Sequence, residues 1–151
     1  DQATGGFEPN AHNAQDLGST SKRWDDVWST GGINGSDRNL KEDIQDLDEA
    51  EKRVAVACKS LVKKYRLKSA VEKKGDDART HVGVIAQELQ AAFEAEGLDP
   101  FKYSMVCRDT WYEKEIDGSV DVKNVPTEGY QEVTQMSVRY TELLAFIISA
   151  I

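Results

Sequence analysis

The most informative stretch of this 151-residue sequence is INGSDRNLKEDI, residues 33–44. It reads as a glycine-rich turn in which Ser36 or Asp37 could cap a following helix. Ser36 and Lys41 lie five positions apart, and on an ideal helix they would point about 140° away from each other. A serine–lysine pair would therefore need a turn between the two residues, or a contact between subunits.

A helical pattern follows this stretch. Apolar residues recur at helical spacing from Ile44 to Tyr65, and Asp48 with Glu51 three positions later predicts a capping box at the helix start. The next stretch, residues 65–71, reads as a strand. The segments beyond it are predicted as a turn (74–77), a second strand (80–85), a short amphipathic helix ending at Gly97, and a further helical turn capped by Asp99-Pro100.

The C-terminal third combines an extended region with an apolar helix. Residues 105–139 are extended, and Asp117-Gly118 is a strong hairpin-turn signal. The hairpin carries charges on both faces and has little to pack on, so it is expected to project from the body. Residues 140–151 are apolar on nearly all sides, which predicts a helix buried against other helices and favours oligomerisation.

The N-terminal segment, residues 1–35, differs in composition from the rest. It is rich in Gly, Ser, Asn and Asp, with only short apolar pieces, and cannot bury a core alone. We expect it to be stable only by pairing with other chains or with an upstream sheet. Because the sequence begins Asp-Gln-Ala rather than Met, we also expect it to be part of a longer protein.

Composition excludes several classes of function. The net charge of −8 argues against nucleic acid as a partner, and no apolar run approaches the roughly 20 residues of a membrane span. Cys58 and Cys107 lack CxxC spacing and read as small buried hydrophobes, which suits a reducing cytoplasm. His12 and His81 have no neighbouring Cys or His to complete a metal site.

The pattern Ser36-Asp37-x-x-x-Lys41-x-x-Ile44 resembles the self-cleavage motif of the intramolecular chaperones of phage tailspikes and endosialidases, classed as peptidase family S74. The same family includes a domain of the eukaryotic myelin regulatory factor. The resemblance continues, in order, through KYRL (64–67), HVGVIAQEL (81–89) and YTELL (140–144). Residues 16–24 are similar to the short β-strand unit that precedes such domains in phage fibres.

The resemblance implies a serine endopeptidase that cuts itself once, between Gly35 and Ser36. Ser36 would be the nucleophile and Lys41 the general base, which must be desolvated because a free lysine, with a pKa of about 10.4, is protonated. Gly35 would tolerate backbone strain beside the cut. Asp37 would either orient Lys41 or cap the helix. His81 would either assist near the bond or be a hydrogen-bonded core residue. No cofactor or metal is implied.

The resemblance also implies an α+β fold, with helices around a small antiparallel sheet, a projecting hairpin and a short N-terminal β-stalk. Residues 1–35 would end the parent fibre, and residues 36–151 would form a homotrimeric chaperone acting on its upstream β-structure. Assembly would occur in the host cytoplasm, before the fibre joins the virion tail. The alternatives are a non-cleaving trimerisation cap or receptor-binding fibre tip, and the membrane-linked transcription-factor form of the domain.

Overall fold

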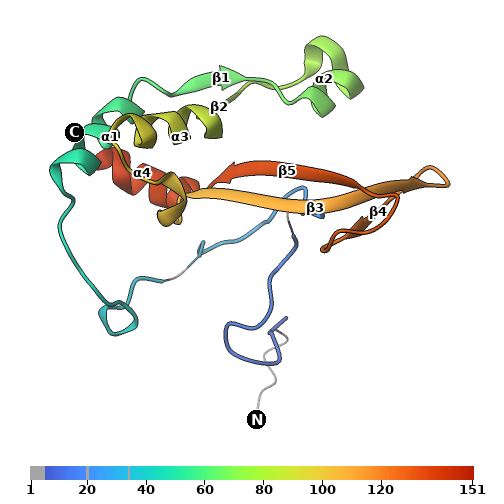
Figure 1. Cartoon of the computed structure of the whole chain (residues 1–151), viewed down its shortest axis with the longest axis horizontal. Helices are drawn as coiled ribbons and strands as arrows, with labels where there is room; N and C mark the ends of the chain where they lie inside the picture. The colour runs from blue at the N-terminus through green and yellow to red at the C-terminus, as the bar shows by residue number, and fades with distance from the viewer. Residues whose placement is uncertain (1–5, 20, 34) are drawn as a thin grey trace. The chain divides into compact units, whose positions relative to one another are not determined.

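The computed structural model describes residues 6–19, 21–33 and 35–151 (Figure 1). The α-helices are α1 (Glu49–Cys58), α2 (Lys68–Lys74), α3 (Ala86–Ala95) and α4 (Tyr140–Ile148). The strands are β1 (Lys63–Tyr65), β2 (His81–Gly83), β3 (Val106–Ile116), β4 (Ser119–Lys123) and β5 (Gln131–Val138). The short 3-10 helices of the described residues are η1 (Arg38–Leu40), η2 (Gly75–Asp77) and η3 (Pro100–Lys102). This mixture of helices and small antiparallel sheets confirms the α+β class.

The chain divides into two compact units. One contains residues 1–36 and 111–132, and the other contains residues 37–110 and 133–151. Within the described ranges, none of the helices is long and apolar enough to cross a bilayer.

Helix α1 begins where the sequence predicts. The Asp48 carboxylate accepts from the Glu51 amide at 2.8 Å, and the Glu51 carboxylate accepts from the Asp48 amide at 2.8 Å. These two bonds satisfy amides that the first helical turn leaves without partners. The helix ends at Cys58, so the apolar periodicity that continues to Tyr65 extends beyond the helix.

The prediction of a strand at residues 65–71 is wrong for most of these residues. Strand β1 covers only Lys63–Tyr65, and Lys68–Lys74 forms α2 instead. The sequence KSAVEKK contains mainly good helix formers, and their propensity outweighs the β-branched Val71. The predicted turn at 74–77 corresponds to η2, although Lys74 still belongs to α2. The strand predicted at 80–85 is present only as β2, His81–Gly83, which pairs antiparallel with β1.

Helix α3 ends at Ala95 and is closed, as expected, by Gly97, whose φ is +74°. The Gly97 amide donates to Glu94 O, and the Leu98 amide donates to Phe93 O, both at 3.0 Å. This pair of bonds is the Schellman arrangement that closes many helices. The next turn, η3, is capped by Asp99, as the sequence predicts.

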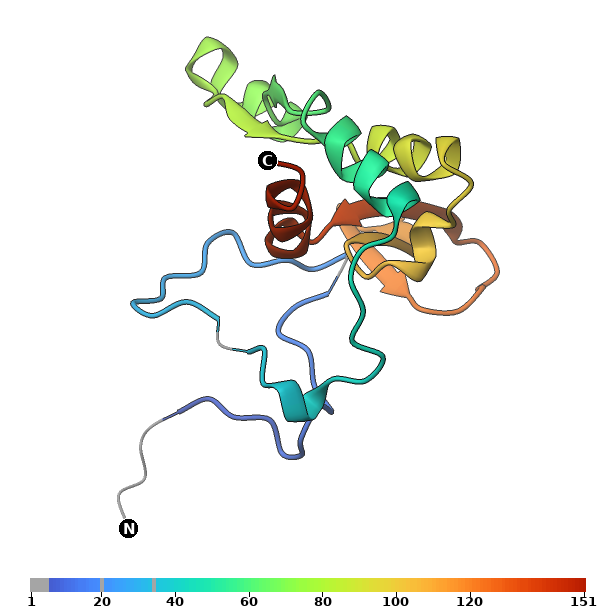
Figure 2. The same ribbon diagram turned by 90° about the vertical axis from the view of Figure 1, so that its left-hand side faces the viewer.

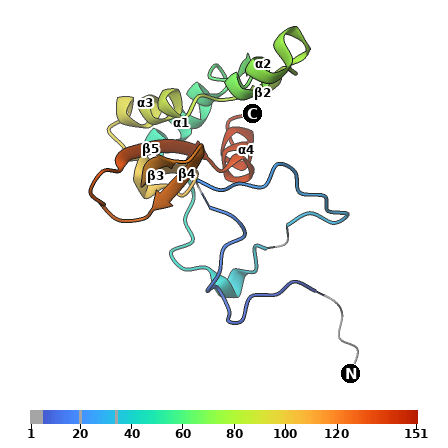
Figure 3. The same ribbon diagram turned by 90° about the vertical axis from the view of Figure 1, so that its right-hand side faces the viewer.

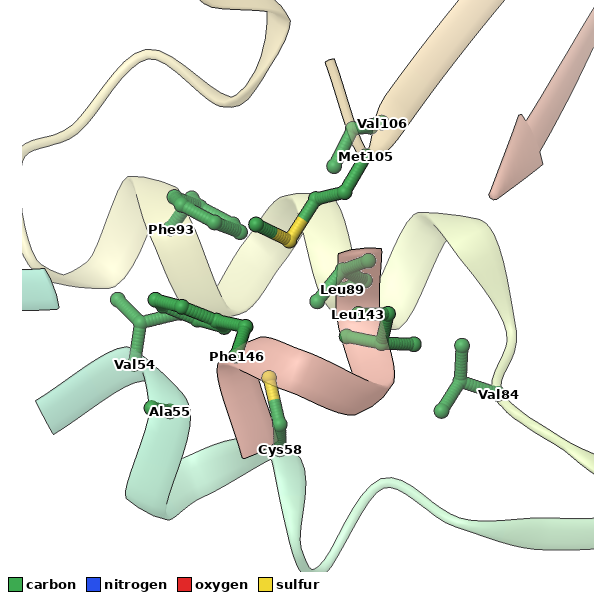
Figure 4. Close-up of a cluster of buried hydrophobic side chains, with 10 residues drawn as sticks. All are labelled: Val54, Ala55, Cys58, Val84, Leu89, Phe93, Met105, Val106, Leu143 and Phe146. Atoms are coloured by element: carbon green, nitrogen blue, oxygen red, sulfur yellow. The ribbon is translucent and has the colours of Figure 1, made fainter. Parts of the chain in front are cut away.

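The core of the second unit forms where α1, α3 and α4 meet the start of β3 (Figure 4). Helix α1 contacts both α3 and α4, and the three helices can be followed from opposite sides in Figures 2 and 3. Phe93 is fully buried, with its ring 5.8 Å from that of Phe146 and 4.7 Å from that of Tyr103. Burial of the Cys58 side chain is also complete, whereas Cys107 is only half-buried.

The extended region forms a three-stranded sheet in the order β4-β3-β5. Strands β3 and β4 pair antiparallel around Asp117 and Gly118, whose φ values are +50° and +78°. Two consecutive positive φ values are characteristic of a type I′ turn, which matches the twist of a hairpin. Trp111 in β3 is 5% exposed, whereas residues 114–120 around the hairpin turn are all exposed.

The described residues of the N-terminal segment do not form the predicted β-stalk in the single chain. Residues 1–5, 20 and 34 lie outside the described residues, and the described part of 6–33 contains turns and bends rather than strands. Its large apolar side chains are exposed: Phe7, Leu17, Trp24, Val27, Trp28 and Ile33. A segment with so little apolar burial lacks partners for an ordered sheet, so the stalk stays a prediction about an assembled protein.

Candidate functional site

Ser36 is the last residue of the first unit, and its backbone is strained. Its φ is +92°, a region that residues with a side chain rarely adopt. Such a conformation costs of the order of 1–3 kcal/mol, and strained residues cluster at active sites, ligand clamps and switch regions. Gly35 has no such φ, so the strain expected at Gly35 is instead on the C-terminal side of the Gly35–Ser36 bond. Both residues are exposed to solvent in the single chain.

Asp37 and Lys41 flank the short helix η1 in the second unit. Asp37 Oδ1 accepts from the Asn39 amide at 2.9 Å, so this carboxylate caps the turn. Lys41 follows the turn in extended conformation, and its amide donates to Arg38 O at 3.1 Å. The short helix η1 therefore lies between Ser36 and Lys41 in the sequence. A regular α-helix, which would direct the two side chains apart, is not formed there.

His81 starts strand β2 and is exposed, so it is not the core histidine that was one of the two alternatives. Tyr65 of β1 is its partner in the strand register. The two rings stack, with centroids 5.8 Å apart and planes 17° apart. Stacking across a strand pair fixes the direction in which the imidazole points.

Cys58 places a thiol, which is a potential nucleophile, in the core of the second unit. Burial raises the pKa of the Cys58 thiol to about 11, which keeps it protonated at neutral pH. It is therefore a packing residue. Across the described ranges, His, Cys, Asp and Glu side chains form no cluster of three or more that could hold a metal ion.

One contact was not anticipated from the sequence. The Tyr140 hydroxyl at the start of α4 reaches Val84, just after β2, and accepts from its amide at 3.1 Å. The two residues are 56 positions apart. The only sequence signal was that Gly83 and Tyr140 each belong to a stretch resembling the same family, and no local pattern indicates that these stretches touch.

Helices and two small antiparallel sheets, in a chain whose Ser36 has a strained backbone, define a small α+β domain. Residues 36–98 match the family model Peptidase_S74, described as chaperone of endosialidase. The chain belongs to this family, and its relatives are phage tail fibre and tailspike proteins. It thus carries an intramolecular chaperone domain of the kind attached to phage tail fibres.

Three similar proteins illustrate the relationship. The probable tail spike protein of Klebsiella phage 0507-KN2-1 is 47% identical over 77 residues, which are 50% of this chain and 6% of that protein. The carboxy-terminal domain of the bacteriophage T5 L-shaped tail fibre, solved with its intramolecular chaperone domain, is 29% identical with a TM-score of 0.73. That match covers 95% of this chain and 35% of the other. A crystal structure described as a novel intramolecular chaperone is 31% identical with a TM-score of 0.58, over 74% of this chain and 91% of that one.

Proposed function

We propose that this chain trimerises, guides folding of the phage fibre to which it is attached, and then releases itself by autoproteolysis between Gly35 and Ser36. The observation that carries the proposal is the position of Ser36. It is the first residue of the family match, and it has a φ of +92°. A strained serine at the junction of two sequence segments is suited to attack on its own preceding carbonyl.

The chemistry is a serine-dependent acyl transfer. Ser36 Oγ attacks the Gly35 carbonyl carbon while its proton passes to a base. The bond between that carbon and the Ser36 nitrogen then breaks, and the nitrogen takes a proton to become a free amine. An ester joins Gly35 to the Ser36 oxygen. Water hydrolyses the ester, leaving a carboxylate on Gly35 and restoring the Ser36 hydroxyl.

Lys41 is the base in this proposal. A lysine accepts a proton only when its amine is neutral, and removal from water favours the neutral form. Lys41 is exposed in the single chain. Packing of subunits around it would supply the missing burial, so cleavage would wait until the trimer has formed. Asp37, which caps η1, would hold the turn between Ser36 and Lys41, and His81 would assist near the bond.

The surface of α4 supports trimerisation. One side of the helix is buried against the core through Leu143 and Phe146. A neighbouring side carries Tyr140, Leu144 and Ile148, which are 41%, 55% and 65% exposed. Their i, i+4, i+8 spacing places these three side chains in one stripe along the helix. We assign this α4 stripe to contacts between subunits.

A charge placed in the α4 stripe should prevent trimer formation. The variant Leu144→Glu/Ile148→Glu would have to bury two carboxylates between subunits, at a cost of several kcal/mol each. We expect a folded monomer by light scattering, with the helical circular dichroism kept and cleavage lost. Ala145→Glu is the control, because Ala145 is exposed on the same helix outside the stripe. A trimer that survives the double substitution would rule out the stripe as the interface.

The chaperone role follows from the difficulty of folding intertwined β-fibres. Such fibres have high contact order, and their strands must find register across three chains. A separately folding trimer at the chain end raises the local concentration of the strands and aligns them. The three-stranded sheet within residues 105–138 would project and hold the growing fibre. Release would then make the fibre's stability kinetic, because the folding route can no longer be reversed.

This sequence of events would take place in the host cytoplasm, with the finished fibre in the virion tail and the chaperone domain released. The upstream β-structure of the parent fibre would be its partner. A non-cleaving trimerisation cap or a receptor-binding fibre tip is the alternative, in which the domain stays attached to the mature fibre.

Intact mass after expression tests the proposal. We expect two products from the 151-residue chain, residues 1–35 and residues 36–151, with Ser36 at the new N-terminus of the larger one. Light scattering should give three times the mass of that larger product. A full-length mass that persists after trimer formation would favour the non-cleaving alternative.

A further inference from the structure

The hydroxyl of Tyr140, the first residue of α4, is hydrogen-bonded to Val84, the residue that follows β2. It accepts from the Val84 amide at 3.1 Å and donates to the Val84 carbonyl at 3.4 Å. Val84 is 7% exposed and belongs to the same buried cluster as Leu143 of α4 (Figure 4). Buried backbone groups need partners, and here one side chain satisfies both groups of a residue just beyond its strand.

Gly83 is the residue that makes room for this contact. A Cβ atom at Gly83 would overlap the Tyr140 hydroxyl and would lie 3.1 Å from Tyr140 Cζ. The φ of Gly83 is not positive, so the backbone conformation alone does not require glycine. The Tyr140 hydroxyl therefore occupies the space that a side chain at position 83 would need. This close approach explains the glycine within the stretch HVGVIAQEL.

Tyr65 extends the contact to His81. Its hydroxyl lies 3.2 Å from the same Cβ position, and a hydrogen bond with Tyr140 raises the pKa of Tyr65. The ring of Tyr65 also stacks on His81. A continuous series of contacts thus runs from α4 through Tyr140 and Tyr65 to the imidazole.

We propose that Tyr140 is a positioning residue, which orients His81 through Tyr65 once α4 is docked. The inference rests on the proposed autoproteolysis, in which His81 assists. Tyr140 also begins the α4 stripe, so contacts between subunits on α4 would restrain the tyrosine that holds β2. Assembly would in this way set the direction of a side chain that cleavage uses.

The test is a time course of cleavage in Tyr140→Phe. Phenylalanine keeps the ring, and hence the apolar stripe, while removing the hydroxyl. We expect an unchanged trimer mass and a cleavage rate about tenfold lower, the effect of losing roughly one hydrogen bond's worth of positioning. Tyr103→Phe is the matched control. It removes a tyrosine hydroxyl that donates to Glu51 at 2.8 Å in the same unit, and it should cleave at the parental rate.

Repeating the Tyr140→Phe change in a His81→Ala variant shows whether the loss of cleavage rate depends on His81. In His81→Ala, the further change Tyr140→Phe should leave the cleavage rate unaltered, because no imidazole remains to be oriented. The same tenfold loss in that background would overturn the positioning role. So would a parental rate for Tyr140→Phe alone, even though autoproteolysis itself would stand.

The contact can also be tested without cleavage, which separates this inference from the proposed function. Gly83→Ala should lower the melting temperature, because the new methyl group meets the Tyr140 hydroxyl. Gly83→Ala/Tyr140→Phe should melt at a higher temperature than Gly83→Ala alone, since the overlapping oxygen is gone. If the second substitution gives no recovery, the assigned contact is wrong.

Discussion

Replacing Ser36 by alanine should leave the chain uncut while it still folds and trimerises. The substitution removes the only hydroxyl that can attack the Gly35 carbonyl from the adjacent residue, and the peptide bond is otherwise stable on the time scale of expression. Ser36 is exposed and lies outside the buried cluster, so loss of its Oγ creates no cavity. Alanine also has a Cβ, so it bears the same backbone strain at a φ of +92°.

The measurement is intact mass of Ser36→Ala beside its oligomeric state. We expect a single full-length species and a trimer. Ser29→Ala is a matched control, because Ser29 is an exposed serine in the same segment whose Oγ accepts from the Gly32 amide. That variant should be cut normally. Cleavage of Ser36→Ala at the same bond would show that another group is the nucleophile.

Local chemistry decides how much of the fold can be predicted from the sequence. The start of α1 follows from Asp48 and Glu51 three positions apart, and the end of α3 follows from Gly97. The hairpin follows from Asp117-Gly118, where both residues adopt positive φ. Each of these signals acts within a few residues, so no knowledge of the tertiary structure is needed to interpret it.

Features that depend on distant residues could not be predicted in this way. The Tyr140–Val84 contact joins two positions whose separation in the sequence is large, and no periodic pattern connects them. The prediction for residues 65–71 fails for a different reason. This short segment has mixed propensities, and no side-chain cap marks it as a helix. The sheet order β4-β3-β5 also depends on β5, whose pairing no local signal identifies.

The candidate site also combines features that the local sequence indicates with features that it does not. The sequence offers Ser36 or Asp37 as a cap, and in the structure it is Asp37 that caps η1. The roles of Ser36 and Lys41 come from the family resemblance, because five positions on a helix would separate their side chains. The strain on Ser36 rather than on Gly35 emerges only from the backbone conformation.

Replacing Lys41 by arginine should slow cleavage by about 10²- to 10⁴-fold, the usual contribution of a positioned acid–base group. The guanidinium keeps the positive charge and much of the length of the side chain, but it does not give up its proton in a protein. It therefore cannot accept the proton of Ser36 Oγ. Lys41→Ala removes the base altogether and should be equally slow. Because Lys41 is exposed in the single chain, neither change should disturb the core.

The comparison that decides the role of Lys41 is a cleavage time course measured beside melting temperature and trimer mass. Lys52→Arg is the matched control. Lys52 is a partly exposed helix residue paired with Glu49 at 2.7 Å, and arginine can keep that ion pair, so cleavage should proceed at the parental rate. A solvated Lys41 that served only as a surface charge would tolerate arginine equally well. Normal cleavage in Lys41→Arg would therefore refute the serine–lysine dyad. Slow cleavage by an intact trimer would show that the reaction needs a lysine that can lose its proton, rather than a positive charge at that position.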